Sequence, residues 1–177
     1  MNSIFSRTLK ALCVVSTAVL LTACGGASST IDAFKPTRII AFGDGFSYVD
    51  GSGYGLSTVR TNEVDNTIAG RIAARASIVV KNVASNPLDT TGGFSYANPK
   101  ARVADVDSQI TAFLASAGGV VAKKDLIIIT VGNWDIYDAA RSGVTSMDPT
   151  TTTLVTAIQR LTNAGAEHVV VMPPINM

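Results

Sequence analysis

The chain has 177 residues, of which 47% are hydrophobic and 15% are charged, so it is long enough for one domain with a core and too apolar to be disordered. Fourteen lysines and arginines nearly balance thirteen aspartates and glutamates, and the net charge of +1 comes without any basic run. Nucleic acid is therefore not an expected partner. The composition also excludes a coiled coil, a collagen-like repeat and a disulfide framework.

The N-terminus has the pattern of an export signal. Two basic residues precede an apolar run over residues 11–21, which is too short to span a bilayer but has the length of a secretory signal. The run ends in Leu-Thr-Ala-Cys at residues 21–24, which resembles a bacterial lipobox in which the thiol of Cys24 receives diacylglycerol. We predict that residues 1–23 are a lipoprotein signal peptide; an ordinary signal peptide or a single anchor helix is the alternative.

A lipid on Cys24 would attach the mature chain to a membrane, because several acyl chains on one residue anchor stably. Residues 24–36 then form a flexible tether, and residues 37–177 form the domain. The residue after Cys24 is Gly25 rather than aspartate, which by resemblance to sorting in Gram-negative bacteria indicates the outer membrane. We therefore expect a lipid-anchored protein of the bacterial cell envelope.

Signal cleavage would also limit the chemistry that the chain can perform. Removing residues 1–23 takes away Cys13 and two basic residues, so the mature net charge becomes −1. With Cys24 acylated, no thiol is left for a disulfide, a metal ligand or a nucleophile. Because His168 is the single histidine, we expect no zinc site and no cofactor.

Four short apolar runs rich in β-branched residues predict buried parallel strands, at residues 38–42, 77–82, 125–131 and 168–172. Helical periodicity between these runs predicts helices over residues 63–75, 106–114 and 154–161, with a short helix after Asp135. This alternation predicts an open parallel α/β sheet with the strand order 2-1-3-4 and helices on both faces.

Ligands of such sheets bind beyond the carboxyl ends of the strands. The turns after Phe42 and Val131 are therefore the candidate site. Asp44 and Asp135 lie in these turns, and both are good N-cap residues for the helices expected to follow.

Four segments resemble, in order and spacing, the conserved blocks of the SGNH/GDSL hydrolases. Residues 42–47 read FGDGFS where the family has Gly-Asp-Ser-Leu-Ser, and residues 94–103 read FSYANPKARV, similar to the second block. Residues 125–136 resemble the third block, which ends in Gly-x-Asn-Asp, and residues 166–174 resemble the next strand and its exit. The resemblance implies a flavodoxin-like three-layer α/β/α sandwich. It also implies serine-dependent hydrolysis of carboxylic esters through an acyl-enzyme, with a Ser-His-Asp triad and an oxyanion hole.

The residues that carry this chemistry in the family are changed here. The nucleophile position, which also supplies an oxyanion N–H, is Gly45. The second-block glycine falls at Pro99 or Lys100, and the third-block asparagine falls at Trp134, with Asn133 one position early. The Asp-x-x-His block would lie beyond Met177, so the resemblance covers a C-terminally truncated domain.

Local substitutes for the lost groups are weak. Ser47 is a hydroxyl two residues after Gly45, but a serine needs a base within about 3 Å. The only imidazole, His168, is expected at the start of the last strand, at the opposite end of the sheet. We therefore count no catalytic residue as intact.

Three interpretations remain open. The chain is an inactive or severely impaired ester-hydrolase-like lipoprotein, or a non-catalytic envelope module that binds an ester or acylated glycan, or a fragment of a longer hydrolase. The aromatic residues Phe46, Tyr48, Tyr54 and Trp134 near the old cleft favour the second. The last strand is expected to form an open apolar sheet edge, through which the protein would self-associate.

Overall fold

A computed structural model of the chain describes residues 33–49, 67–84, 91–172 and 174. The chain divides into two compact units, Met1–Phe34 and Lys35–Met177, and all elements below belong to the second. At its centre lies a parallel sheet of five strands in the order β2-β3-β1-β4-β5. The strands are β1 (Arg38–Gly43), β2 (Val80–Asn82), β3 (Gly92–Ser95), β4 (Asp125–Thr130) and β5 (His168–Met172).

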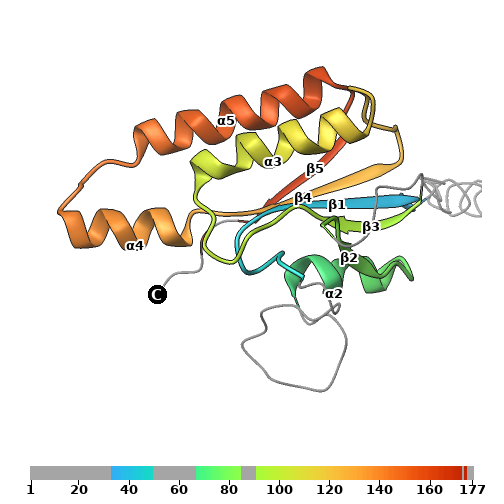
Figure 1. Ribbon diagram of the computed structural model, residues 1–177, viewed down its shortest axis with the longest axis horizontal. Coiled ribbons are helices and arrows are strands. Elements are labelled where there is room, and N and C mark those ends of the chain that lie inside the picture. Colours follow the sequence, from blue (N-terminus) through green and yellow to red (C-terminus); the bar gives the residue numbers. More distant parts are fainter. Residues whose placement is uncertain (1–32, 50–66, 85–90, 173, 175–177) are drawn as a thin grey trace, which may run out of the picture. The chain divides into compact units, whose positions relative to one another are not determined.

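Helices cover both faces of the sheet (Figure 1). Successive side chains of a strand point to opposite faces, so β1 and β4 contribute to two apolar clusters. On one face Ile40 and Ile127 pack with α3 (Val103–Ser116) and α5 (Asp148–Asn163). On the other face Ile39 and Ile128 pack with α2 (Ile68–Arg75). The predicted three-layer α/β/α architecture is therefore confirmed.

The strand β3 was not predicted from the sequence. β3 pairs with both β1 and β2, so the predicted order holds for the four predicted strands, but β3 separates β2 from β1. Its sequence, Gly-Gly-Phe-Ser, is short and carries two residues of low strand propensity. A Cβ on Gly93 would lie 2.8 Å from the carbonyl oxygen of Val79. The close approach of β2 therefore requires a glycine that weakens the strand signal.

The helix after β4 starts earlier than predicted. α4 (Asn133–Ser142) has Gly132 as its N-cap, with φ of +110°. Asp135 therefore lies in the first turn, and the prediction that Asp135 caps this helix is wrong. Its carboxylate instead accepts the backbone N–H of Val103, the first residue of α3, at 3.1 Å. Asp44 does cap a single turn, because its carboxylate accepts the N–H of Phe46.

The other helices agree with the predicted pattern. α2 starts after Thr67, whose hydroxyl accepts the N–H of Gly70 at 3.0 Å, and the first part of its predicted range, residues 63–66, lies outside the described residues. α5 starts six residues before the predicted apolar period, with Pro149 in its first turn.

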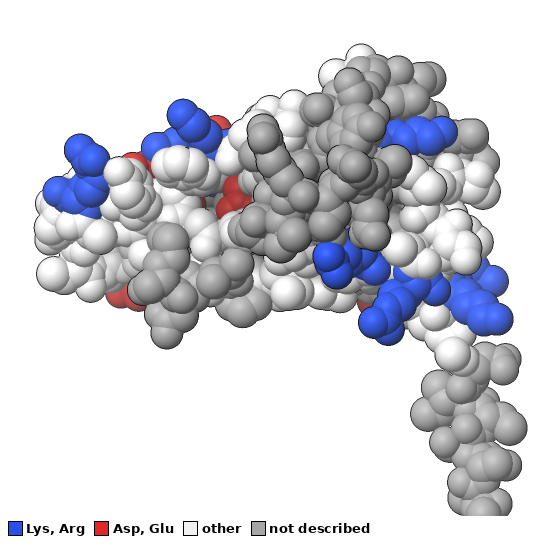
Figure 2. All heavy atoms as spheres, turned by 90° about the horizontal axis from the view of Figure 1, so that it is seen from below, with Lys and Arg blue, Asp and Glu red and all other residues white. Residues whose placement is uncertain are grey.

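One face of the domain shows how its charged side chains are distributed. Where side chains are described on the face shown in Figure 2, lysines and arginines lie in separate groups with a few acidic residues between them. Among the described residues, none of the helices has the length and apolar character needed to cross a bilayer.

Candidate functional site

The carboxyl ends of β1, β3 and β4 meet at one edge of the sheet, as predicted for the candidate site. The N–H of Asp44 bonds the carbonyl of Thr130 at 2.7 Å, and the N–H of Asn98 bonds the carbonyl of Gly43 at 2.9 Å. These bonds join the turn after β1 to the end of β4 and to the turn after β3. The first three sequence blocks therefore come together in space.

The turn after β1 is held by a buried amide. The side chain of Gln109, on α3, accepts the N–H of Gly43 at 2.6 Å and donates to its carbonyl at 3.1 Å. Gly43 has a φ of +112°, and a Cβ there would lie 1.9 Å from the carbonyl oxygen of Thr130. A glycine is therefore required at this turn, and Gln109 fixes its orientation.

Asp44 is a buried carboxylate at the centre of the site, with only 1% of its surface exposed. It accepts the N–H of Phe46 and the side-chain amide of Asn133, each at 3.1 Å. Burial raises the pKa of the Asp44 carboxyl above its usual value, and the bonds from Asn133 and Phe46 offset part of this rise. Asn133, one position before the asparagine of the family's third block, thus gives Asp44 a partner from the first turn of α4.

The nucleophile position and its nearest substitute offer no activated hydroxyl. Gly45 lacks a side chain, and Ser47 is fully buried. The hydroxyl of Thr130 donates to the Ser47 oxygen at 2.8 Å, and the hydroxyl of Ser95 donates to the Ser47 carbonyl at 2.6 Å. Ser47 therefore ties β1 to β3 and β4 inside the protein.

The residues at two of the oxyanion positions, Trp134 and Lys100, lie against each other. The indole N–H of Trp134 donates to the carbonyl of Pro99 at 3.2 Å. The ammonium of Lys100 lies 5.9 Å from the centre of the Trp134 ring. Pro99 has no N–H to donate, and the indole N–H of Trp134 is already directed at the carbonyl of Pro99.

His168 lies at the opposite end of the sheet, as predicted. It pairs in register with Leu126 near the start of β4, whereas the site lies beyond Thr130. Four residues of strand separate the two points by roughly 13 Å. This imidazole is too far away to act as the base for a nucleophile in the turn after β1.

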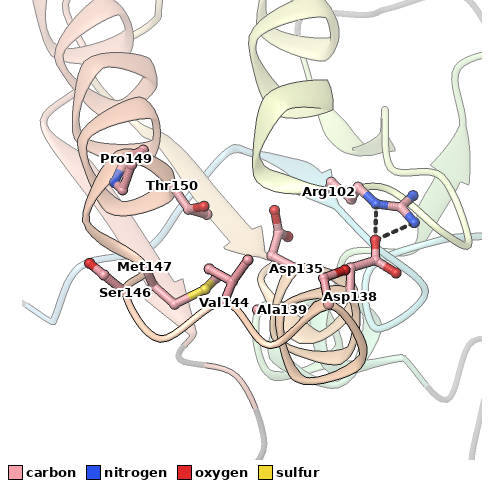
Figure 3. A pocket seen from close by; sticks show the side chains of 10 residues that line it. Arg102, Asp135, Asp138, Ala139, Val144, Ser146, Met147, Pro149 and Thr150 are labelled. Carbon is pink, nitrogen blue, oxygen red and sulfur yellow. Dashed lines mark hydrogen bonds and ion pairs between the residues drawn. The ribbon is translucent and has the colours of Figure 1, made fainter.

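Beside this cleft lies a pocket of about 330 Å³ that the sequence did not indicate. Figure 3 shows Arg102 reaching Asp138 of α4 from one side, and the connection between α4 and α5 closing the other side. Burial raises the pKa of Asp135, and the N–H of Val103 and the charge of Arg102 oppose this rise. The lining residues are Arg102, Asp135, Asp138, Ala139, Ser142, Val144, Ser146, Met147, Pro149 and Thr150.

Among the described residues, no three histidine, cysteine, aspartate or glutamate side chains lie close enough together to hold a metal ion.

The fold and this edge of the sheet define an α/β domain with a site at the carboxyl ends of its strands. The model of one family, the GDSL-like lipases and acylhydrolases, matches residues 39–177. The chain therefore belongs to the GDSL family, and the resemblance seen in its four blocks is confirmed.

A solved structure of a related protein is similar to part of this chain. The chain is similar to a solved member of the lipolytic G-D-S-L family from Veillonella parvula, with 20% identity and a TM-score of 0.45 over 76% of this chain. It spans 56% of the length of that protein. A comparison with curated proteins found no significant match.

Proposed function

We propose that this chain is a GDSL-family lipoprotein in which the family reaction, serine-dependent hydrolysis of carboxylic esters, is lost or severely impaired. The observation that carries the proposal is Gly45 at the position of the nucleophile. An acyl-enzyme cannot form on a residue without a side chain. Glycine also has no hydroxyl from which a general base could remove a proton. The buried hydroxyl of Ser47 gives no replacement.

The surroundings of Gly45 support the same conclusion. An oxyanion hole works because donors point at the place where negative charge develops. Here Trp134 donates to Pro99, and Asn133 donates to Asp44.

The proposed location is the bacterial cell envelope, with Cys24 acylated and residues 24–36 as the tether, on the outer membrane. The sequence pattern of residues 21–24 supports this part of the proposal. The anchor would hold the domain against a membrane whatever the state of its site.

One experiment tests both parts. The protein is extracted from its native cells, treated with a serine-directed fluorophosphonate and weighed intact by mass spectrometry. We expect the mass of a chain that starts at acylated Cys24, with no phosphonyl group added, because no activated serine is present.

The controls separate the two parts of that proposal. Cys24→Ser should lose the acyl mass, and an active GDSL hydrolase should label fully under the same conditions. Gly45→Ser should remain unlabelled, because the restored hydroxyl has no base within reach. Stoichiometric labelling that Ser47→Ala removes would contradict the loss of activity.

A second candidate function is a non-catalytic module that binds an ester or acylated glycan of the envelope. It is favoured by an exposed strip along α4 and the turn after β3, here called the α4 strip: Lys100, Trp134, Tyr137 and Arg141. The rings of Trp134 and Tyr137 meet edge to face at 5.7 Å. Arg141 lies over Tyr137 at 5.6 Å and donates to its hydroxyl.

The α4 strip combines flat apolar rings with hydrogen-bond donors. Rings of this kind pack against the apolar face of a sugar, and the cations can donate to the carbonyl oxygen of an acyl group. Tyr137 is 43% exposed and available for such contact. Phe46 and Tyr48 are half-buried, and Tyr54 lies outside the described residues.

Trp134 is the only tryptophan of the chain, so its fluorescence reports directly on the α4 strip. Titration with acetylated envelope polysaccharides should give a saturable shift, lost in Tyr137→Ala and kept in Val120→Ala, a surface control remote from the strip. A flat response to every polysaccharide would count against the binding module.

A further inference from the structure

Among the helices that the structure describes, α4 is the only one that buries none of its residues. No residue of α4 belongs to either apolar cluster of the domain. The side of α4 turned toward α3 and α5 borders the pocket of about 330 Å³, where Asp135, Asp138, Ala139 and Ser142 line the cavity (Figure 3). Segments with few buried apolar contacts are among the least stable parts of a fold. Apolar packing therefore does little to hold α4 in place.

A glycine with a left-handed backbone lies at each end of α4. Gly132 precedes the helix with a φ of +110°, and Gly143 follows it with a φ of +68°. Hinges are a few residues at the ends of elements that absorb large changes in φ and ψ, and glycine does so at little steric cost. Residues 144–146, which follow Gly143, are all exposed. The backbone thus offers a pivot on both sides of the helix.

Polar contacts from the first two turns of α4 hold it against the neighbouring segments of the candidate site. The bonded pairs are Asn133 with Asp44, Trp134 with Pro99, Asp135 with Val103, and Asp138 with Arg102. The side chains of Arg102 and Asp138 are 46% and 43% exposed, and exposed ion pairs contribute little stability because water replaces each partner. The contacts that keep α4 closed are therefore ones that can open without unfolding the core.

We propose that α4 is a hinged cover of the candidate site, which pivots at Gly132 and Gly143 while the sheet and the other helices stay folded. Opening breaks the four contacts together, because one helix carries them all. It uncovers the carboxylate of Asp44, which is 1% exposed when α4 is closed, and admits a ligand to this edge of the sheet. The inference does not depend on whether the hydrolase site is active.

The backbone N–H of Val103 reports whether α4 is closed. It donates to the carboxylate of Asp135, at 3.1 Å to the nearer oxygen, so opening of α4 removes its acceptor. The N–H of Gly43 is the reference, because it lies at the same edge of the sheet but bonds Gln109 of α3. Opening of α4 leaves that bond intact.

Amide hydrogen exchange of the full chain in detergent micelles, followed residue by residue by NMR, tests the proposal. The N–H of Val103 should exchange at least about 100-fold faster than that of Gly43. Low concentrations of urea should accelerate exchange at Gly43 and leave Val103 nearly unchanged, because a hinge motion exposes far less surface than global unfolding. Equal rates with an equal response to urea would overturn the proposal, since α4 would then open only with the whole domain.

Asp138→Asn distinguishes movement of the helix from rotation of the Asp135 side chain alone. The variant removes the ion pair with Arg102 and should raise the exchange rate at Val103 about fivefold. It should also increase the quenching of Trp134 fluorescence by acrylamide, because the indole leaves its place in the cleft with the rest of α4. A faster exchange without a change in quenching would contradict the hinge.

Asp107→Asn is the matched control. It breaks an exposed ion pair with Arg160, between α3 and α5, and should change neither the exchange rate at Val103 nor the fluorescence quenching. If the first variant does not fold, Arg102→Gln removes the same ion pair from the other side. The same response in the control as in the variant of α4 would overturn the proposal.

Discussion

Replacing Gly43 with alanine is expected to lower the free energy of unfolding by about 4 kcal/mol. Gly43 ends β1 with a φ of +112°, a conformation that residues with a Cβ rarely adopt. The added Cβ would lie 1.9 Å from the carbonyl oxygen of Thr130 and 2.6 Å from its carbonyl carbon. Both are backbone atoms of a central strand, so the strand itself would have to move.

Urea denaturation followed by circular dichroism measures this loss. Gly143→Ala is the matched control, because Gly143 also has a positive φ, of +68°, but has open space where its Cβ would be. It should lose only about 1–2 kcal/mol, the conformational cost alone. Equal losses in the two variants would show that β4 can shift freely, contrary to the contact with Thr130.

The effect should reach the candidate site. Gly43 is held by Gln109 through both of its backbone polar groups. Asp44 follows it directly and is fixed to Thr130 and Asn133. A shift of this turn therefore moves the buried carboxylate as well as the strand, so the geometry around Gly45 depends on one glycine and one distant amide.

Much of the fold could be predicted from the sequence because its two central strands, β1 and β4, are almost entirely buried on both faces. β1, β4 and β5 are nearly continuous apolar runs, a pattern that strands between two helical layers produce. β3 could not be predicted, since Gly93 is selected by the approach of β2 and not by strand propensity. The start of α4 was also missed, because Gly132 takes the cap position in a left-handed conformation that leaves no side-chain signal.

The sequence predicted where the residues of the candidate site lie, but it did not predict the hydrogen bonds between them. The four blocks placed Gly45, Pro99, Lys100 and Trp134 at one edge of the sheet. The bonds from Trp134 to Pro99 and from Asn133 to Asp44 depend on the rotation of the first turn of α4, which a sequence does not specify. The role of Gln109 could not be predicted either. Nothing in the sequence indicates that its side-chain amide bonds the backbone of Gly43, which is 66 residues away.

A second large loss of stability is expected at the amino ends of β1 and β4, opposite the candidate site. There Arg38 and Asp125 form a buried ion pair. The guanidinium donates to both carboxylate oxygens, at 2.8 and 2.5 Å, and the two side chains are 8% and 0% exposed. Asp125 also accepts the N–H of Ala122, and Arg38 lies over the ring of Phe113. Both charges are buried and hydrogen-bonded to each other. Removing either one would therefore leave the other buried without a partner, at a large cost in free energy of unfolding.

Either single replacement, Arg38→Met or Asp125→Leu, should destabilise the domain by about 3–5 kcal/mol, because it leaves one charge buried without its partner. The double variant should cost less than the sum of the two, since it removes both charges together and fills the space with apolar atoms. Urea denaturation of the four proteins measures this cycle.

Lys123→Ala is the control, because it breaks the exposed pair with Glu167. It should change the free energy of unfolding by less than about 1 kcal/mol. Strict additivity in the cycle would show that Arg38 and Asp125 contribute separately, through packing alone, and that the pairing of β1 with β4 does not depend on their charges.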